Sequence, residues 1–408
     1  MPITLSLSDR SLHARDHFHR MAADHMRPIS RKYDDHEHDL PTEWVDWYWK
    51  TGRFTQAGGE GASDGFVQVC IQAEELCWGD AGLYLRTPFA GLGGSAVGAT
   101  GTPEQKQRYL AVFADPSAQP AWGAMAITEP GAGSDSAAIE TTATPSGDHY
   151  VLNGTKIFCT GGDGAASSPA GFVVVWATVD KSAGRGGIKA FVVPAGTPGM
   201  SVVGLERKLG IRASDTATLR FENCRVPRAN LLGAEQVKRD DDAKQTGDKG
   251  FKGAMATFDA SRPLVAAMAV GVGRAALDFV KEELAKSGIA PRYDAPPVQL
   301  TAIERDLAEM EAELQAARLL TWRAAAMMNR RLPNSLEASM AKAKAGSAVT
   351  KITQKAVELL GPLGYSKKLL VEKWMRDAKI NDIYEGTQQI NLLIVARRIL
   401  DYSSAMLR

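Results

Sequence analysis

The chain has 408 residues, 44% hydrophobic and 23% charged, close to the average for a soluble globular protein. This length predicts two or three domains, and the composition excludes a chain that is disordered throughout. The 48 Lys and Arg residues balance 47 Asp and Glu residues. That balance excludes a global basic field able to recruit nucleic acid or anionic lipid.

The four cysteines are sparse and follow no CxxC or zinc-like spacing, so we expect reduced, buried thiols. The N-terminal segment has no apolar core of a secretory signal, and Asp9 and Asp16 argue against a transit peptide. No run of about 18 apolar residues occurs, so no membrane span is expected. We therefore expect a cytoplasmic protein.

Residues 1–122 form the first compositional zone and predict helices broken by glycine. His36, Glu37 and His38 resemble a metal site at first sight. Ligands two residues apart do not share a helical face, so a solvated polar face is the favoured interpretation and no metal is expected.

Residues 123–235 form a second zone of short β-branched and aromatic runs separated by turn residues. This spacing predicts antiparallel strands in a sandwich or small barrel. Asn153-Gly154 predicts a hairpin turn. Residues 236–250 are strongly charged and predict a solvated loop or mobile insertion.

Residues 251–408 form a third, helical zone. An apolar stripe at alternating spacings of four and three residues predicts one long helix; its members are Ile303, Leu307, Met310, Leu314 and Ala317. Further helices are expected over residues 264–284, 336–360 and 388–400. Several long helices with short loops predict an antiparallel bundle.

Two segments of the second zone suit a ligand. In residues 126–135 two glycines and a proline set a tight turn, and Thr128 and Ser134 add hydroxyl groups, although a plain surface turn explains this segment about as well. Phe158 and Thr160 alternate along a strand and share a face that suits a flat heteroaromatic cofactor, with an ordinary edge strand as the alternative. The glycine-rich residues 91–98 follow no clear strand and predict a loop or a helix-packing device.

Residues 376–390 predict a helix that breaks at Gly386 and resumes. Glu385 lies at this break. Buried against apolar groups, its carboxyl group would have a raised pKa and act as a base near neutrality; the alternative is an exposed Glu at a helix end.

Five strings together resemble the acyl-CoA dehydrogenase family in order and in approximate spacing. They are AMAITEPGAGSD (124–135), NGTKIFCTGG (153–162), KLGIRASDTATLRFENCRVP (208–227), ATFDASRP (256–263) and MRDAKINDIYEGTQQI (375–390). The resemblance covers nearly the whole chain and is weakest before residue 64 and over residues 237–250. It implies an α+β fold with an N-terminal helical domain, a middle antiparallel β-domain and a C-terminal four-helix bundle.

The resemblance also implies FAD as cofactor and Glu385 as the base that removes the α-proton of an acyl-CoA thioester while a hydride passes to flavin N5. The product would be a trans-2-enoyl-CoA, as in fatty-acid or lipid β-oxidation, and an electron-transfer flavoprotein would accept the electrons. Residues implied in FAD binding are Met125, Ile127, Thr128, Ser134, Phe158, Thr160, Thr387 and Gln389. Residues implied in substrate binding are Ser134, Asp259, Arg262, Tyr384 and Gly386.

The sequence departs from the family at two points. The family's Arg followed by Phe-Gly, which reaches a neighbour's FAD, has only Arg292 and Tyr293 as a possible remnant. Glu358 stands where the family usually has Gln, and Pro362 replaces a Gly. A carboxylate near a pyrophosphate is unfavourable, and proline removes a donor. A heteromeric α2β2 assembly, in which a related subunit supplies the missing contacts, and simple sequence drift in a homo-oligomer both remain open.

Two further alternatives stay open. A flavin oxidase or monooxygenase of the same fold usually lacks Glu at the position of Glu385. A non-catalytic or partly catalytic partner subunit is disfavoured by the presence of Glu385, Thr128 and Thr160.

Overall fold

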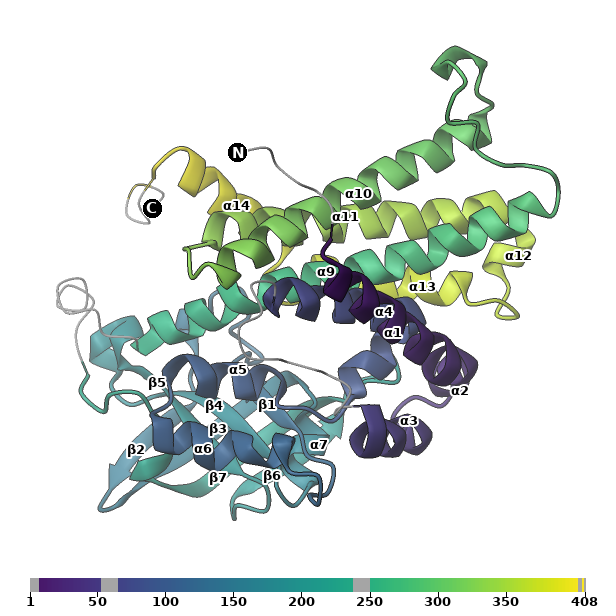
Figure 1. Ribbon diagram of the computed structural model, residues 1–408. Helices are drawn as coiled ribbons and strands as arrows, with labels where there is room; N and C mark the ends of the chain where they lie inside the picture. Colours follow the sequence, from purple (N-terminus) through teal and green to yellow (C-terminus); the bar gives the residue numbers. More distant parts are fainter. Residues whose placement is uncertain (1–6, 53–64, 238–249, 403–405, 407–408) are drawn as a thin grey trace.

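The computed structural model describes residues 7–52, 65–237, 250–402 and 406, without the side chains of residues 250–256. The strands gather in one lobe and the long helices in another, as Figure 1 shows. Helix α9 (Gly250–Ala285) starts beside the strands and runs into the helical lobe. The charged loop predicted at 236–250 lies almost wholly outside the described residues.

Helices dominate the N-terminal region, as the sequence predicts. Helix α1 starts at a serine cap, where Ser8 Oγ accepts a hydrogen bond from Ser11 N, and this satisfies an otherwise unpaired first-turn amide. The longer helices are α1 (Asp9–Met21), α4 (Gly65–Arg86), α5 (Gly91–Thr100) and α6 (Pro103–Leu110). Shorter elements are η1 (Ala22–Met26), η2 (Arg27–Ile29), α2 (Ser30–Asp35), α3 (Thr42–Trp47), η3 (Tyr48–Gly52) and η5 (Ala111–Ala114).

The glycine-rich segment predicted as a loop or a packing device is helix α5, and it packs against the sheet. A Cβ added to Gly93 would lie 2.6 Å from Ala124 O, on the first strand of the sheet. The absence of a side chain therefore lets the helix approach the strand backbone closely. The packing interpretation is confirmed.

An eight-stranded sheet forms the middle domain, with the order β6-β7-β3-β2-β4-β5-β8 and β1 paired to β4. Most pairs are antiparallel, as predicted, but β1 and β2 each pair β4 in parallel. The strands are β1 (Gly123–Ala126), β2 (Thr142–Ser146), β3 (His149–Thr160), β4 (Phe172–Thr178), β5 (Ile188–Pro194), β6 (Met200–Leu205), β7 (Thr216–Pro227) and β8 (Leu231–Leu232). Helix α7 (Gly162–Ser167) and the 3-10 turns η6 (Ser136–Ala138), η7 (Lys181–Gly187) and η8 (Arg228–Asn230) connect them.

The hairpin turn predicted at Asn153-Gly154 is wrong. The β2–β3 turn lies at Gly147, which has φ +61°, and β3 continues through Asn153 and Gly154 with a register shift against β7. A Cβ at Gly154 would lie 2.4 Å from Thr141 Oγ1. Glycine serves close packing at an irregular point of the strand, a role that the Asn-Gly pair alone does not distinguish from a turn.

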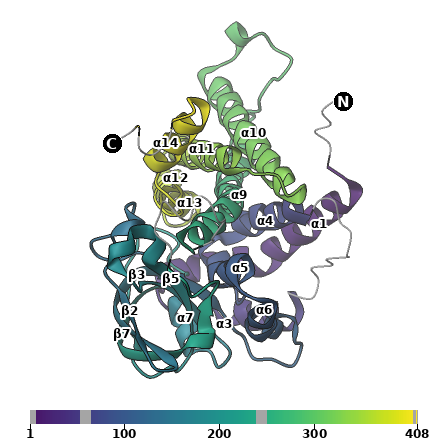
Figure 2. The same cartoon turned by 90° about the vertical axis from the view of Figure 1, so that its left-hand side faces the viewer.

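The C-terminal region is a helical bundle built on α9, α10 (Ala302–Asn329) and α11 (Ser335–Leu360), as Figure 2 shows from the side. The predicted stripe on α10 is confirmed, since Leu307, Met310, Leu314 and Ala317 are buried and Ile303 packs on the same core. The remaining elements are η9 (Pro297–Gln299), α12 (Pro362–Tyr365), α13 (Val371–Ala378), η10 (Lys379–Asp382) and α14 (Gln388–Ile399).

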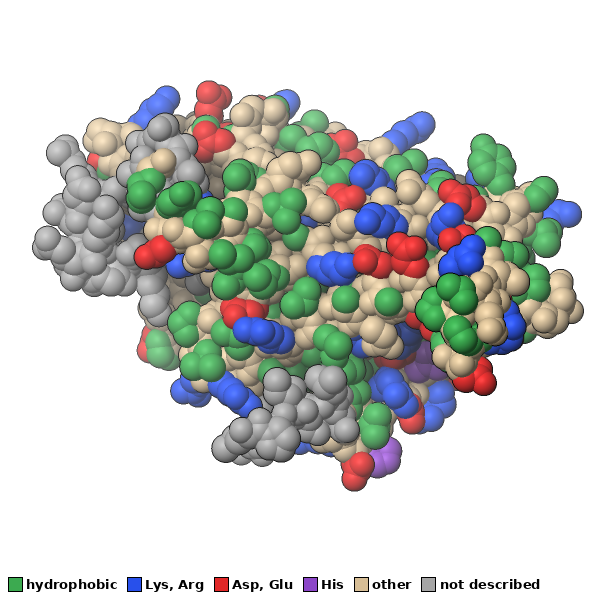
Figure 3. All heavy atoms as spheres, turned by 90° about the horizontal axis from the view of Figure 1, so that it is seen from above, with side chains coloured by type: hydrophobic (Ala, Val, Ile, Leu, Met, Phe, Trp, Pro, Cys, Tyr) green, Lys and Arg blue, Asp and Glu red, His purple; other side chains and the backbone are tan. Residues whose placement is uncertain are grey.

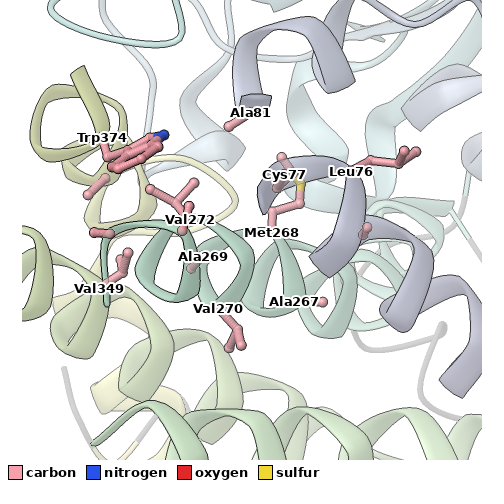
Figure 4. Packing of buried hydrophobic residues seen from close by; sticks show 14 of the residues in the cluster. Leu76, Cys77, Ala81, Ala267, Met268, Ala269, Val270, Val272, Val349 and Trp374 are labelled. Carbon is pink, nitrogen blue, oxygen red and sulfur yellow. The ribbon is translucent and has the colours of Figure 1, made fainter. Parts of the chain in front are cut away.

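The main core lies around α9. Leu76 and Cys77 of α4 pack against one part of α9, while Trp374 of α13 and Val349 of α11 cover another part, as Figure 4 shows. All four cysteines are free and buried, as expected for structural thiols. The contacts of α9 with α4 and α11 make it the helix that joins the N-terminal and C-terminal helical regions.

Residues Thr257–Ala285 of α9 are long and apolar enough to span a membrane, although charged residues interrupt the apolar run. The most apolar window of this segment is 78% buried inside the protein. Burial of this kind is expected for the central helix of a bundle, so the segment is weak grounds for a membrane span.

The segment around His36 forms the predicted solvated face only in part, since His36 is exposed whereas Glu37 and His38 are half-buried. Glu37 accepts hydrogen bonds from Lys208 N at 2.7 Å and Arg212 Nη2 at 3.3 Å, and His38 Nε2 lies 3.0 Å from Glu206 O. The segment also joins the helical region to the β-domain through Glu37 and His38, a long-range contact that local spacing cannot predict. Within the described residues, no group of three or more His, Cys, Asp or Glu side chains could hold a metal ion.

Candidate active site

The predicted break around Gly386 is present and spans residues 383–387, between η10 and α14. Glu385 has φ +57° and Gly386 has φ +91°. A left-handed conformation is uncommon for glutamate and costs about 1–3 kcal/mol, so the surroundings must hold it in place.

Two side chains hold the carbonyl group of Gly386, the residue that follows Glu385. Lys342 Nζ of α11 donates to Gly386 O at 2.7 Å, and Asn391 Nδ2 of α14 donates to the same oxygen at 2.8 Å. Thr387 Oγ1 accepts from Ile390 N at 3.3 Å and caps α14. The break is thus tied to two helices.

The carboxylate of Glu385 is half-buried and accepts a hydrogen bond from Ser261 Oγ of α9, with 2.5 Å between Ser261 Oγ and Glu385 Oε2. Burial raises the pKa of Glu385 above its ordinary value, while the Ser261 hydrogen bond and the charges of Arg262 and Lys342 oppose the rise. A carboxylate in this setting is a stronger base than one in water, which is the condition for proton abstraction near neutrality.

Arg262 lies beside this group and is buried. Its Nη1 donates to Asp259 Oδ1 at 2.7 Å and lies 3.4 Å from Ser339 Oγ. Burial raises the pKa of Asp259, and the guanidinium group of Arg262 opposes the rise. Two residues predicted to bind substrate, Asp259 and Arg262, therefore lie together with Glu385 and Gly386. Tyr384, a third, donates its hydroxyl to Asn381 Oδ1 at 3.1 Å.

A second group of predicted residues lies in the β-domain, around the end of β1. Thr128 O accepts a hydrogen bond from Ile157 N at 2.9 Å, which joins the segment after β1 to the middle of β3. Lys156 Nζ is fully buried and binds Ile127 O at 3.1 Å and Glu129 Oε1 at 2.7 Å. These bonds fix the backbone on both sides of Thr128.

Glu129 completes the network below Thr128. Its carboxylate also accepts from Glu140 N at 2.6 Å and Thr141 N at 2.9 Å. Although burial acts to raise the pKa of Glu129, Lys156 and the amides hold it below its ordinary value. A buried ion pair with its remaining lone pairs satisfied is a rigid support for the loop above it.

Phe158 and Thr160 share a local face of β3, but not through a regular strand. A bulge shifts the register against β7 between Lys156 and Cys159, and Phe158 has φ +56°. Lys156 and Cys159 are therefore both buried although they are three residues apart, and Phe158 is turned outward with 59% of its surface exposed.

Three comparisons with known proteins agree on the family. The family models described as acyl-CoA dehydrogenase N-terminal, middle and C-terminal domain match residues 8–116, 124–224 and 248–400. The short-chain specific acyl-CoA dehydrogenase of Clostridium acetobutylicum is 35% identical over 386 residues, covering 93% of this chain and 94% of that protein. This chain belongs to the acyl-CoA dehydrogenase family.

Two further relatives agree with this assignment. The rat mitochondrial short-chain specific acyl-CoA dehydrogenase is 37% identical over 377 residues, covering 91% of this chain and 86% of that protein. The solved structure of butyryl-CoA dehydrogenase from Megasphaera elsdenii superposes with a TM-score of 0.83 at 32% identity, covering 98% of this chain and 100% of that chain. The chain is therefore an acyl-CoA dehydrogenase by family, a flavoprotein oxidoreductase, with the predicted α+β fold of helical, β-sheet and helical domains.

The surface of this acyl-CoA dehydrogenase around β3 fits a flavin. Phe158 presents an exposed ring. The hydroxyls of Thr128 and Thr160 are half-buried, and neither bonds to another side chain or backbone group in the described part of the chain. An exposed aromatic face beside two free hydroxyls is suited to stacking on a flat heteroaromatic ring and to bonding its polar edge.

The other residues predicted to bind the cofactor differ in burial and in hydrogen-bond partners. Met125 and Ile127 have buried side chains in the β-domain core, and their carbonyls bind Cys159 Sγ and Lys156 Nζ. Ser134 and Gln389 are exposed at the surface. Thr387 is engaged as a helix cap, although a hydroxyl in that position retains a proton to donate.

The two departures from the family have partners within this chain. Arg292 binds Glu304 through Nε at 2.6 Å and through Nη2 at 2.8 Å, next to the capping box that starts α10. Glu358 is exposed and pairs with Lys355 at 2.6 Å. Arg292 is thus held within its own chain in this conformation.

Five residues of the site escaped the sequence reasoning: Ser261, Lys342, Asn391 and the pair Lys156 and Glu129. Ser261 lies between the two residues singled out in FDASRP, and both members of the pair lie inside quoted motifs. Lys342 had a weaker signal, as a lysine on the alanine-rich, core-facing side of a predicted helix.

Proposed function

We propose that this chain oxidises acyl-CoA thioesters to trans-2-enoyl-CoA, with FAD as cofactor and Glu385 as the α-proton base. The observation that carries the proposal is the half-buried Glu385 carboxylate, held by Ser261 in a left-handed turn that Lys342 and Asn391 secure. A plain surface glutamate would need none of these restraints.

The chain's own residues supply binding and proton transfer. Glu385 Oε accepts the α-proton as the bond between Cα and Cβ becomes double. The N–H of Glu385 makes no hydrogen bond within the described part of the chain, so it is free to bind the thioester carbonyl oxygen and stabilise the developing enolate. FAD, when bound, would accept the hydride that leaves the β-carbon. Closure of the site around substrate excludes water and raises the basicity of Glu385 further.

We propose that Thr128, Phe158 and Thr160 hold the flavin ring, since they form the exposed aromatic and hydroxyl surface described above. Met125 and Ile127 would contribute through their backbone, and Ser134, Thr387 and Gln389 through polar contacts with the phosphate-containing parts of FAD or CoA. Asp259, Arg262, Tyr384 and Gly386 would contact the thioester arm.

We propose short acyl chains as substrates, because several of the most similar relatives are named as short-chain or butyryl-CoA enzymes. An electron-transfer flavoprotein is the proposed electron acceptor. In support, one similar chain, with a TM-score of 0.84 at 32% identity, comes from a structure described as an electron transferring flavoprotein of Acidaminococcus fermentans. A cytoplasmic location remains part of this proposal.

We further propose that the chain works as an oligomer, either of identical copies or as α2β2 with a related subunit. The supporting observation is an apolar face on α14 and its C-cap residue, where Leu392, Leu393, Ile399 and Leu400 are between 50% and 61% exposed. Figure 3 shows hydrophobic side chains among charged ones over the helical lobe seen from above. Contiguous exposed apolar side chains commonly mark a protein interface.

The test is anaerobic mixing of the purified, FAD-loaded chain with butyryl-CoA. The proposal predicts loss of the visible flavin absorbance and formation of one enoyl-CoA per flavin. FAD bound near one per chain without any loss of absorbance across short, medium and branched acyl-CoA substrates would refute it. Folded protein that binds little FAD alone, but gains it with a co-purified partner, would support the α2β2 form and a partly catalytic role.

A further inference from the structure

A buried lysine lies beside the proposed base and takes no part in the chemistry described so far. Lys342 is 1% exposed on α11, and its Nζ donates to Gly386 O at 2.7 Å. In the described part of the chain no carboxylate lies within 4 Å of this nitrogen, since no ion pair to it is formed. Lys342 is therefore a buried ammonium group whose close partner is a backbone carbonyl.

Such a group is costly to bury, so its presence needs a reason. Burial lowers the pKa of Lys342 to about 8, and the more distant carboxylates of Asp382 and Glu385 oppose the decrease. Lys344, two residues along the same helix, shows the ordinary solution, because its half-exposed ammonium group pairs with Glu313 Oε2 at 2.7 Å. Packing of α11 alone would be served as well by Met or Leu at position 342.

The carbonyl that Lys342 binds belongs to the residue after Glu385. Glu385 and Gly386 both have positive φ, and the peptide between Gly386 and Thr387 is held at its carbonyl by both Lys342 and Asn391. Without the Lys342 bond, the turn would be held at this carbonyl by Asn391 alone. A turn of unfavourable conformation needs several restraints to keep a single geometry.

We infer that Lys342 is a positioning residue for Glu385, which holds the turn through Gly386 O and keeps the carboxylate beside Ser261. This inference rests on the proposed role of Glu385 as the base. It adds a residue that acts through the backbone of Gly386 and sets the geometry in which the base works.

The charge of Lys342 adds a second, measurable consequence. The groups that face Glu385 are Ser261 and Arg262 from α9, Lys342 from α11 and the neighbouring Tyr384, and the two cations favour the carboxylate form. Removing the charge of Lys342 therefore raises the pKa of the base and moves the acid limb of kcat to higher pH. A residue that only packs α11 would not move this limb.

Three variants separate these effects. Lys342→Met removes both the hydrogen bond and the charge, and Lys342→Gln keeps a donor but removes the charge. Lys344→Met is the matched control, since it removes a half-exposed, ion-paired charge from the same helix. Each is compared with the wild-type holoenzyme by its pH profile of kcat, its KM for butyryl-CoA, its thermal unfolding and amide hydrogen exchange over residues 384–391.

We expect kcat of Lys342→Met to decrease about tenfold with KM changed less than threefold, because a displaced catalytic group affects turnover more than binding. The acid limb should move up by about one pH unit in both Lys342 variants. Amide exchange over residues 384–391 should accelerate in Lys342→Met without substrate, and Lys344→Met should behave as wild type. An unchanged acid limb in Lys342→Gln, together with unchanged exchange or kcat in Lys342→Met, would overturn the inference.

If Lys342→Met does not fold, the pH profile of Lys342→Gln alone decides the question. A separate Glu385→Gln variant distinguishes the two levels of the argument. Residual activity near wild type in Glu385→Gln would refute the proposed base. An inactive Glu385→Gln together with silent Lys342 variants would refute only the role of Lys342.

Discussion

The hydrogen bond from Ser261 to Glu385 provides the sharpest prediction for the proposed base. Ser261→Ala removes the donor and leaves the carboxylate half-buried without it. A hydrogen bond to a charged group is worth about 1.5–3 kcal/mol, and loss of roughly half of this from the ionised form raises the pKa of Glu385 by about one unit. The base acts only when deprotonated, so activity is lost as pH falls through this pKa, and the acid limb must move upward.

The magnitude can be worked out at one pH. One unit below the wild-type midpoint, about a tenth of the wild-type base and about a hundredth of the variant base would be ionised, so kcat should differ roughly ninefold. Two units above that midpoint, the two enzymes should differ by about 10%. The assay is the pH profile of kcat with butyryl-CoA, with Ser261→Thr as the matched variant that keeps the hydroxyl.

An acid limb that stays in place in Ser261→Ala would show that the hydroxyl does not bind the ionised base. A limb that moves equally in Ser261→Thr would show that side-chain volume, and not the donor, matters. Thermal unfolding of Ser261→Ala should remain close to wild type, since the change removes one oxygen atom from a packed site.

Three other predictions concern stability. Burial raises the pKa of Glu385 in the folded state, so the ionised carboxylate lowers stability as the pH rises above the pKa of the unfolded chain. Glu385→Gln should therefore raise Tm at neutral pH, and this gain should vanish in acid. An equal gain at every pH would contradict this reasoning. Gly93→Ala should lower Tm because the new Cβ would lie 2.6 Å from Ala124 O. Gly98→Ala on the same helix is the control: its Cβ would meet no atom within 4 Å, so the change should be neutral or stabilising by up to about 1 kcal/mol. Equal effects of the two changes would refute the packing argument. Lys156→Met should lower the free energy of unfolding in urea by about 3–5 kcal/mol, because the buried Glu129 carboxylate loses its paired cation. Adding Glu129→Gln to this variant should recover part of the lost stability. Additive losses in the double variant would contradict a direct pair.

The fold could be predicted where local pattern and tertiary burial agree. The stripe on α10 is an example, because residues spaced by four and three positions must share a face and that face meets the core. The Asn153-Gly154 pair shows the limit, because glycine is needed there to let Thr141 approach, and only the tertiary structure reveals that neighbour. The contacts of Glu37 could not be predicted for the same reason, since its partners lie about 170 residues away in sequence.

The candidate site shows the same division. Glu385 could be singled out because its motif places a carboxylate beside a glycine at a helix break. The groups that hold it come from two other helices, Ser261 from α9 and Lys342 from α11, and no local pattern connects them to Glu385. The bulge at Phe158, which shifts the alternation of buried and exposed residues along β3, could not be predicted either, because it depends on how β3 pairs with β7.

The most direct test of the central claim is the rate at which butyryl-CoA removes the flavin absorbance of Glu385→Gln in a single anaerobic turnover. The account predicts a rate lower by about 10²–10⁴-fold than wild type, with FAD still bound and the control Glu309→Gln, which changes an exposed carboxylate on α10, unaffected. A Glu385→Gln enzyme that loses its flavin absorbance at close to the wild-type rate would contradict the account.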